Sequence, residues 1–167
     1  MNMKYLRDPN SGEVFAFNAD GSEDGFIPED LVAMTAEEVE AHLNPAIVLT
    51  GTDVDAERDR RIDAGVEFQG VMFQSRATDR ENIAGASQLG FMAIVSGAQP
   101  GDLRWSNPDQ DFAWIASDNS LVPMHALAVV AFGKVAAERK QALIYSGRQL
   151  KDMQPIPTDY TDDKWWP

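Results

Sequence analysis

Histidine and carboxylate side chains are the groups in this chain that could carry out metal or acid–base chemistry. The sequence holds two histidines, His42 and His125, and each stands alone on a predicted helix without a second histidine three or four positions away. A zinc site built on a helix needs such a pair. The chain has no cysteine, which excludes disulfides, thiolate ligands and a cysteine nucleophile. We therefore predict neither a metal site nor a bound cofactor.

Closely spaced aspartates are the remaining candidates for catalysis. The pairs Asp53/Asp55, Asp109/Asp111 and Asp162/Asp163 each offer two carboxylates, as the active site of a glycosidase does. Each pair lies in a predicted turn, a first helical turn or the tail, where aspartate has structural reasons to occur. Nothing in the sequence marks one carboxyl group of a pair as buried and the other as solvated. No G-x-S-x-G motif and no phosphate-binding glycine loop is present. We predict no catalytic residues and a protein that is not an enzyme.

The formal charge of −13 is spread unevenly along the 167 residues. Residues 1–50 hold 2 basic and 10 acidic side chains, a net charge of −8, and the rest of the chain holds 12 and 17, a net charge of −5. An acidic surface repels phosphate backbones and anionic membranes. We therefore expect no nucleic-acid partner and no membrane partner. The same charge raises an alternative function, an acidic DNA mimic that inhibits a nucleic-acid-binding protein of the host.

Three segments follow from the pattern of turns, caps and charge. Residues 1–50 form an N-terminal segment, with a hairpin of strands at 3–8 and 13–18 and a helix over 36–43 that begins with the capping-box pair Thr35 and Glu38. Residues 51–154 form the main domain. Residues 155–167 form an extended acidic and aromatic tail, because Pro155 and Pro157 end the last helix.

The main domain begins with a charged helix over about 54–64, which Gly65 ends. A tight hairpin then joins 66–68 to 71–73 across Gln69-Gly70. Thr78 and Glu81 are expected to cap the next helix, which continues to about Val95.

The second half of the main domain predicts another hairpin and a long helix. Strands at 103–105 and 112–115 are expected to pair across a proline-containing turn, with Trp105 and Trp114 facing each other. A helix over about 122–153, with Ser120 as its N-cap and Pro123 in its first turn, would be roughly 45 Å long. A compact domain of this size does not need such a length, so part of this helix is expected to project or to pack against another subunit. The fold class that results is α+β, with short antiparallel β-hairpins packed with helices and one long C-terminal helix.

The aromatic residues near the two ends of the chain are the candidate binding groups. Trp165 and Trp166 end a tail that cannot fold by itself, so they either dock back on this domain or anchor a partner. We predict the partner-binding residues to be Tyr160, Trp165 and Trp166 in the tail, and Phe15 and Phe17 in the N-terminal hairpin.

Two stretches of the sequence resemble bacteriophage proteins. The run ERDRRIDAGVEFQGVMFQSRATDREN at 57–82, followed by LRWSNPDQDFAWIASDNSLVPM at 103–124, resembles a domain of unassigned function found in phage tail-fibre and tail-associated proteins. The opening YLRDPNSGEVFAFNADG, with FIPEDLVAMTAEEVEAHLNP after it, is similar to the start of tail-fibre assembly proteins. The second resemblance implies a chaperone of fibre assembly, although the rest of a typical assembly protein is missing from the chain.

These resemblances imply a phage tail-associated protein that binds tail-fibre or other tail proteins, as an assembly factor or as a small virion component. Self-association is a further expectation. Such a protein works in the host cytoplasm during assembly or in the virion tail. Besides the DNA mimic, a polysaccharide-acting tail hydrolase is a second alternative, and only the carboxylates support it.

Overall fold

The chain divides into two compact units, Met1–Val48 and Leu49–Pro167. The computed structural model describes residues 2–45 and 48–167. Both units combine helices with short antiparallel strand pairs, so the predicted α+β class is confirmed, including the long C-terminal helix.

The first unit is a three-stranded antiparallel sheet with one helix. Its elements are β1 (Met3–Arg7), β2 (Val14–Asn18), the 3-10 helix η1 (Asp24–Phe26), β3 (Val32–Ala33) and α1 (Ala36–Leu43), and the strand order is β2-β1-β3. Thr35 and Glu38 form the predicted capping box at the start of α1. None of the described residues of this unit is fully buried, which fits a segment too small to enclose a core.

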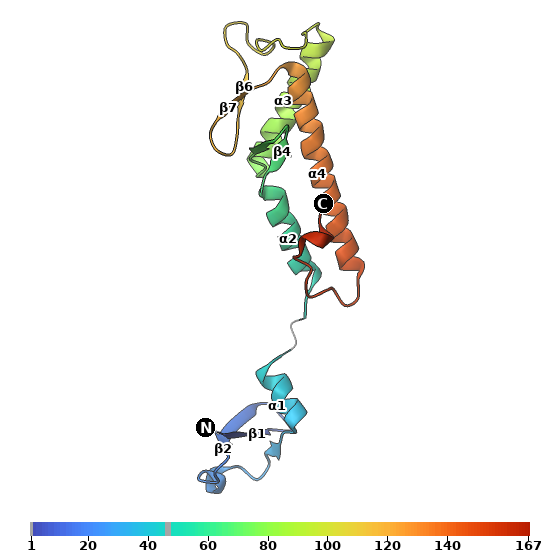
Figure 1. The fold of residues 1–167 in the computed structure, drawn as a ribbon. Coiled ribbons are helices and arrows are strands. Elements are labelled where there is room, and N and C mark those ends of the chain that lie inside the picture. Colours follow the sequence, from blue (N-terminus) through green and yellow to red (C-terminus); the bar gives the residue numbers. More distant parts are fainter. Residues whose placement is uncertain (1, 46–47) are drawn as a thin grey trace. The chain divides into compact units, whose positions relative to one another are not determined.

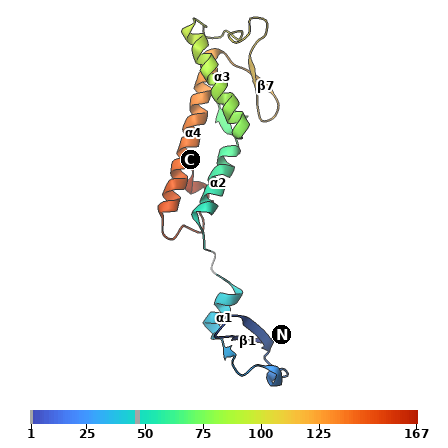
Figure 2. The same cartoon turned by 180° about the vertical axis from the view of Figure 1, so that it is seen from behind.

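The second unit is organised around its longest helix, α4 (Ala126–Asp152). The other elements are α2 (Gly51–Asp63), β4 (Val66–Phe68), β5 (Val71–Phe73), α3 (Ala77–Val95), β6 (Ala113–Ile115), β7 (Leu121–Pro123) and the 3-10 helix η2 (Asp163–Trp165). Both α2 and α3 lie against α4 (Figures 1 and 2). Helix α2 covers the C-terminal half of α4, since Gly51 lies beside Lys151 and Arg58 beside Gly147. Helix α3 covers the N-terminal half, since Ser87 lies beside Gly133 and Gly90 beside Ala126. Both helices therefore run antiparallel to α4. Helices of the same chain thus pack along both halves of α4, whereas we had expected part of this helix to project or to pack against another subunit.

The β4–β5 hairpin forms as predicted because its turn residues accept left-handed backbone angles. Gln69 and Gly70 have φ values of 53° and 78°, and Val66 pairs with Phe73. Gly65 has φ of +119°, and a Cβ atom there would lie 2.8 Å from the carbonyl oxygen of Phe73. Only glycine fits between the end of α2 and this hairpin.

The third hairpin differs from the prediction. Strand β6 pairs with β7 rather than with residues 103–105, and Trp114 lies opposite Val122. Trp105 lies outside the strands, where its Nε1 donates a hydrogen bond to the carbonyl oxygen of Met124 at 2.9 Å. The turn between β6 and β7 contains Asp118, whose carboxylate accepts hydrogen bonds from the N–H and the hydroxyl of Ser120.

Two helix starts also differ from the prediction. Helix α3 begins after Arg76, and the Asp79 carboxylate accepts a hydrogen bond from the Arg76 N–H at 2.9 Å, so Thr78 lies inside the first turn. Helix α4 begins after His125 rather than after Ser120. Residues 121–123 are taken by the β7 strand, and this pairing overrides their fit to a first helical turn.

Two separate hydrophobic clusters hold the second unit together. The first surrounds Phe132 on the N-terminal half of α4, whose ring centroid lies 5.5 Å from that of Phe68, 4.7 Å from that of Phe73 and 5.4 Å from that of Trp114. The second surrounds Leu143 and joins α2, the C-terminal half of α4 and the tail. Each cluster uses its own stretch of α4. Among the described residues, no helix is long and apolar enough to cross a bilayer.

Candidate interaction surface

The predicted binding tryptophans of the tail dock on their own domain. Trp166 is 7% exposed and packs in the cluster of Val54, Ile62, Leu143 and Leu150. While the tail is docked, the Trp166 indole is covered by its own chain and cannot contact a partner. Of the two outcomes that the sequence left open for this side chain, docking back is the one observed.

Hydrogen bonds hold the tail in this position. Trp166 Nε1 donates to the carbonyl oxygen of Tyr160 at 2.8 Å, and Trp165 Nε1 donates to the Asp159 carboxylate at 3.1 Å. Tyr160 and Trp165 are half-buried and pack against the second cluster. The tail is therefore an ordered part of the second unit rather than an extended segment.

Arg61 links the tail to α2. Its guanidinium lies 5.3 Å from the ring centroid of Trp166 and donates a hydrogen bond to the carbonyl oxygen of Thr161 at 2.7 Å. It also forms an ion pair with Asp163 at 2.9 Å. One cation thus contacts the tail through its backbone, a carboxylate and an aromatic face.

The buried carboxylate of Glu57 fixes Arg61 in turn. Glu57 is 8% exposed and accepts hydrogen bonds from Arg60 at 2.7 Å and from Arg61 at 2.6 Å. These hydrogen bonds, that of Arg60 first, lower the pKa of Glu57 below its ordinary value. The cluster has the geometry of a structural ion-pair network, and we assign it no chemistry.

Phe15 and Phe17 lie on β2 in the first unit, where both are half-buried. They alternate along the strand and therefore share one face of the sheet, opposite Leu6 and Lys4. The predicted set of binding residues is thus divided between the two units.

Most of the aspartates that were candidates for catalysis make structural bonds. Asp53 accepts a hydrogen bond from the Thr50 N–H at 2.7 Å at the start of α2, and Asp55 forms an ion pair with Lys151 at 2.6 Å. Asp111 forms an ion pair with Arg104 at 3.0 Å. Over residues 2–45 and 48–167, no three histidine or acidic side chains come close enough together to hold a metal ion.

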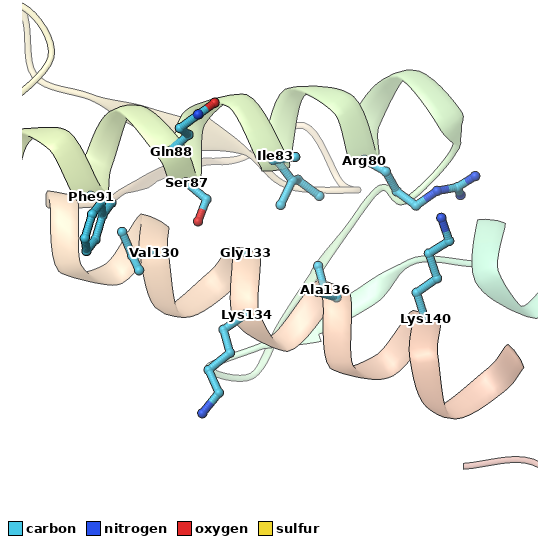
Figure 3. A pocket seen from close by; sticks show the side chains of 12 residues that line it. Arg80, Ile83, Ser87, Gln88, Phe91, Val130, Gly133, Lys134, Ala136 and Lys140 are labelled. Carbon is cyan, nitrogen blue, oxygen red and sulfur yellow. The ribbon is translucent and has the colours of Figure 1, made fainter. Parts of the chain in front are cut away.

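The surface that sequence reasoning missed is a groove between α3 and α4, which we call the α3–α4 groove. Its volume is about 650 Å³, and the residues that line it are Arg80, Ile83, Ala84, Ser87, Gln88 and Phe91 of α3, and Val130, Gly133, Lys134, Ala136, Ala137 and Lys140 of α4 (Figure 3). Most of the residues that line the groove are apolar or small. The charged residues among them are all cations. This composition is unusual on a chain with a net charge of −13.

Close contact of the two helices shapes this groove. A Cβ atom added at Gly133 would lie 2.4 Å from the Ser87 hydroxyl oxygen, and one added at Gly90 would lie 3.1 Å from the carbonyl oxygen of Ala126. Glycine at these positions lets α3 approach α4 closely.

The C-terminal half of α3 continues the apolar surface beyond the groove. Leu89 and Phe91 are each 58% exposed, Met92 is 59% exposed and Val95 is 73% exposed. A helix with apolar residues on all its sides is normally covered on all sides. The sequence carried this signal, since 83–95 has apolar residues on every face, but the run is too short to suggest more than a core helix.

Comparison with known proteins places the second unit in a family. No curated protein and no solved structure matches the chain. One family model, described as Domain of unknown function (DUF4376), matches residues 49–164, which is more than half of the chain and almost the whole second unit. The chain therefore belongs to the DUF4376 family.

Proposed function

We propose that this chain is a bacteriophage tail-associated protein that binds tail-fibre or other tail proteins, as an assembly factor or as a small virion component. The observation that carries the proposal is the apolar surface of α3 and the α3–α4 groove. Four large apolar side chains of one helix, each more than half exposed, are a surface that soluble proteins normally cover.

The resemblance of both units to phage tail proteins gives the kind of partner. The sequence 57–82 and 103–124 that carries it contains α3's first turn and the β6–β7 hairpin, and the N-terminal resemblance lies in the first unit. We propose the host cytoplasm during assembly, or the virion tail, as its place of action.

The two alternatives have less support. The net charge of −13 favours a DNA mimic, but −8 of it lies in residues 1–50, and in the second unit Asp55, Glu57 and Asp63 are each paired with a cation. A glycosidase needs an acid and a base carboxylate in a cleft, whereas the α3–α4 groove is lined by cations and no acid.

Size-exclusion chromatography with light scattering tests the proposal. The full chain is measured alone and mixed with the fibre protein encoded beside it, and with the other tail proteins of the same phage. We expect a complex of defined stoichiometry with at least one of them. A strict monomer that forms no complex with any tail protein would refute the proposal.

A further inference from the structure

We propose that the α3–α4 groove binds an amphipathic α-helix of a partner protein, and that this helix places an acidic side chain at the end of the groove where Arg80 and Lys140 lie. The inference deepens the proposed function and rests on it for the identity of the partner. The chemistry of the occupant follows from the groove itself.

The walls of the groove favour a helix over an extended strand. Both walls are the middle of long helices, Ala77–Val95 and Ala126–Asp152, whose backbone N–H and C=O groups bond within each helix. A strand docked there would find no backbone partner for its own polar groups. A helix satisfies its backbone internally and needs only side-chain contacts, so it is the element that fits.

The lining of the groove suits an apolar helix face. Phe91 and Val130 provide apolar contacts, while Ala84 and Ala137 are exposed and small enough to let another helix approach closely. Figure 3 shows Phe91 and Val130 at one end of the groove, with Ser87, Gly133 and Ala136 between them and the other end.

The other end of the groove is cationic. The Arg80 and Lys140 side chains extend toward one another from the two helices (Figure 3). Arg80 forms an ion pair with Asp63 at 2.6 Å, whereas Lys140 forms no ion pair with any residue that the structure describes. One positive charge at this end is therefore left for a ligand, and a carboxylate is the group that complements it.

A second copy of this chain is a poorer occupant. Isologous pairing of two α3–α4 grooves would gather Arg80, Lys134 and Lys140 of both copies in one interface, and the lining of the groove supplies no carboxylate to pair with them. Such like-charge contact is unfavourable. The long-range repulsion between an acidic partner and a chain of charge −13 is screened within about 8 Å at physiological salt, so the local cations decide the docking.

The test uses two helix-stabilised synthetic peptides and the full-length, isotope-labelled protein. Both peptides carry the same stripe of leucines at i, i+3/i+4 and i+7, and their polar faces are all glutamate or all lysine. Amide chemical shifts locate the binding site and give the affinity. We expect shifts on α3 and α4 and binding of the glutamate peptide about fivefold tighter than of the lysine peptide.

Matched variants test separately the positive charge of the groove and its apolar space. Lys140→Glu should abolish or reverse the preference for the glutamate peptide, while Arg104→Glu makes the same change of charge on an exposed loop residue and should preserve it. Ala137→Trp fills the groove and should weaken both peptides by about tenfold or more. Ala131→Trp, an exposed α4 position outside the groove, should leave the affinity unchanged.

Several outcomes would overturn the inference. These are equal affinity for the two peptides, shifts that map away from the groove, or a wild-type dimer that Ala137→Trp turns into a monomer, which would assign the groove to a second copy. The proposed function fails separately, when no tail protein binds the wild-type chain. A tail complex that Ala137→Trp and Lys140→Glu leave intact would support the proposed function and refute the groove as its site.

Discussion

Replacing Trp166 with alanine measures how much the docked tail stabilises the second unit. The indole is 7% exposed and lies among Val54, Ile62, Leu143 and Leu150. Burial of about 200 Å² of aromatic surface at about 25 cal/mol per Å² gives about 5 kcal/mol as an upper value. The tail can leave the surface after the substitution instead of enclosing a cavity, so we expect a loss of about 3 kcal/mol in the free energy of unfolding.

Urea unfolding followed by far-UV circular dichroism gives this loss from the shift in midpoint at a constant m-value. The matched control is Trp165→Ala, which removes a neighbouring indole that is only half-buried and bonds Asp159 at 3.1 Å. It should lower the free energy of unfolding by about 1 kcal/mol. A loss below about 1 kcal/mol for Trp166→Ala, or equal losses for the two variants, would refute the assignment of Trp166 to the core.

Three further predictions follow from the second unit. Because hydrogen bonds from Arg60 and Arg61 lower the pKa of Glu57 in the folded state, the carboxylate stabilises the fold above its unfolded pKa near 4.5, and this contribution is lost as the pH falls through the folded value. In urea unfolding between pH 7 and pH 3, Glu57→Gln should therefore cost about 1–3 kcal/mol at neutral pH and progressively less in acid, and a constant difference would contradict the pKa argument. Gly133→Ala should lower the melting temperature, because the added Cβ would lie 2.6 Å from the Ser87 Cβ. The control Gly85→Ala meets nothing within 4 Å and should stabilise the fold by about 0.5–1 kcal/mol. Calorimetry that finds the same sign of change for both variants would refute the close contact at Gly133. A chain of residues 49–167 should unfold cooperatively by itself, because both hydrophobic clusters lie within it, and a non-cooperative thermal transition would show that the first unit is required.

Local signals were the part of the fold that the sequence predicts well. The Thr35–Glu38 capping box, the Gly65 stop and the Gln69-Gly70 turn each depend on a few adjacent residues, and all three form as expected. Each motif needs a particular residue type for its backbone conformation or hydrogen bonds, so it can be recognised without knowledge of distant contacts.

Choices between competing local signals were decided by tertiary contacts. Residues 106–109 and 117–119 both look like turns, and the β6–β7 pairing that is observed places Trp114 against Phe132, which lies on α4. The same pairing moves the start of α4 to Ala126, past the proline that suits a first helical turn. Periodicity does not contain this information.

The candidate binding surface was beyond sequence reasoning for a related reason. The sequence shows two tryptophans in the tail but not the surface on which they dock. Trp166 packs against side chains of both α2 and α4, which come together only in the folded structure. The α3–α4 groove arises where Gly133 and Ser87 let two helices meet, and its cations come from Arg80 and Lys140, which are 60 positions apart in the sequence. Only the three-dimensional pairing of the helices brings them to one end.

The division of α4 between two hydrophobic clusters has a consequence for how this domain can vary. Phe132 and Leu143 belong to different clusters, and each cluster closes around its own set of side chains. Substitutions in one cluster should then leave the other undisturbed, and their energetic effects should add. Substitutions in the half of the domain that carries the groove can therefore change the shape and charge of the groove without weakening the half that packs against the tail.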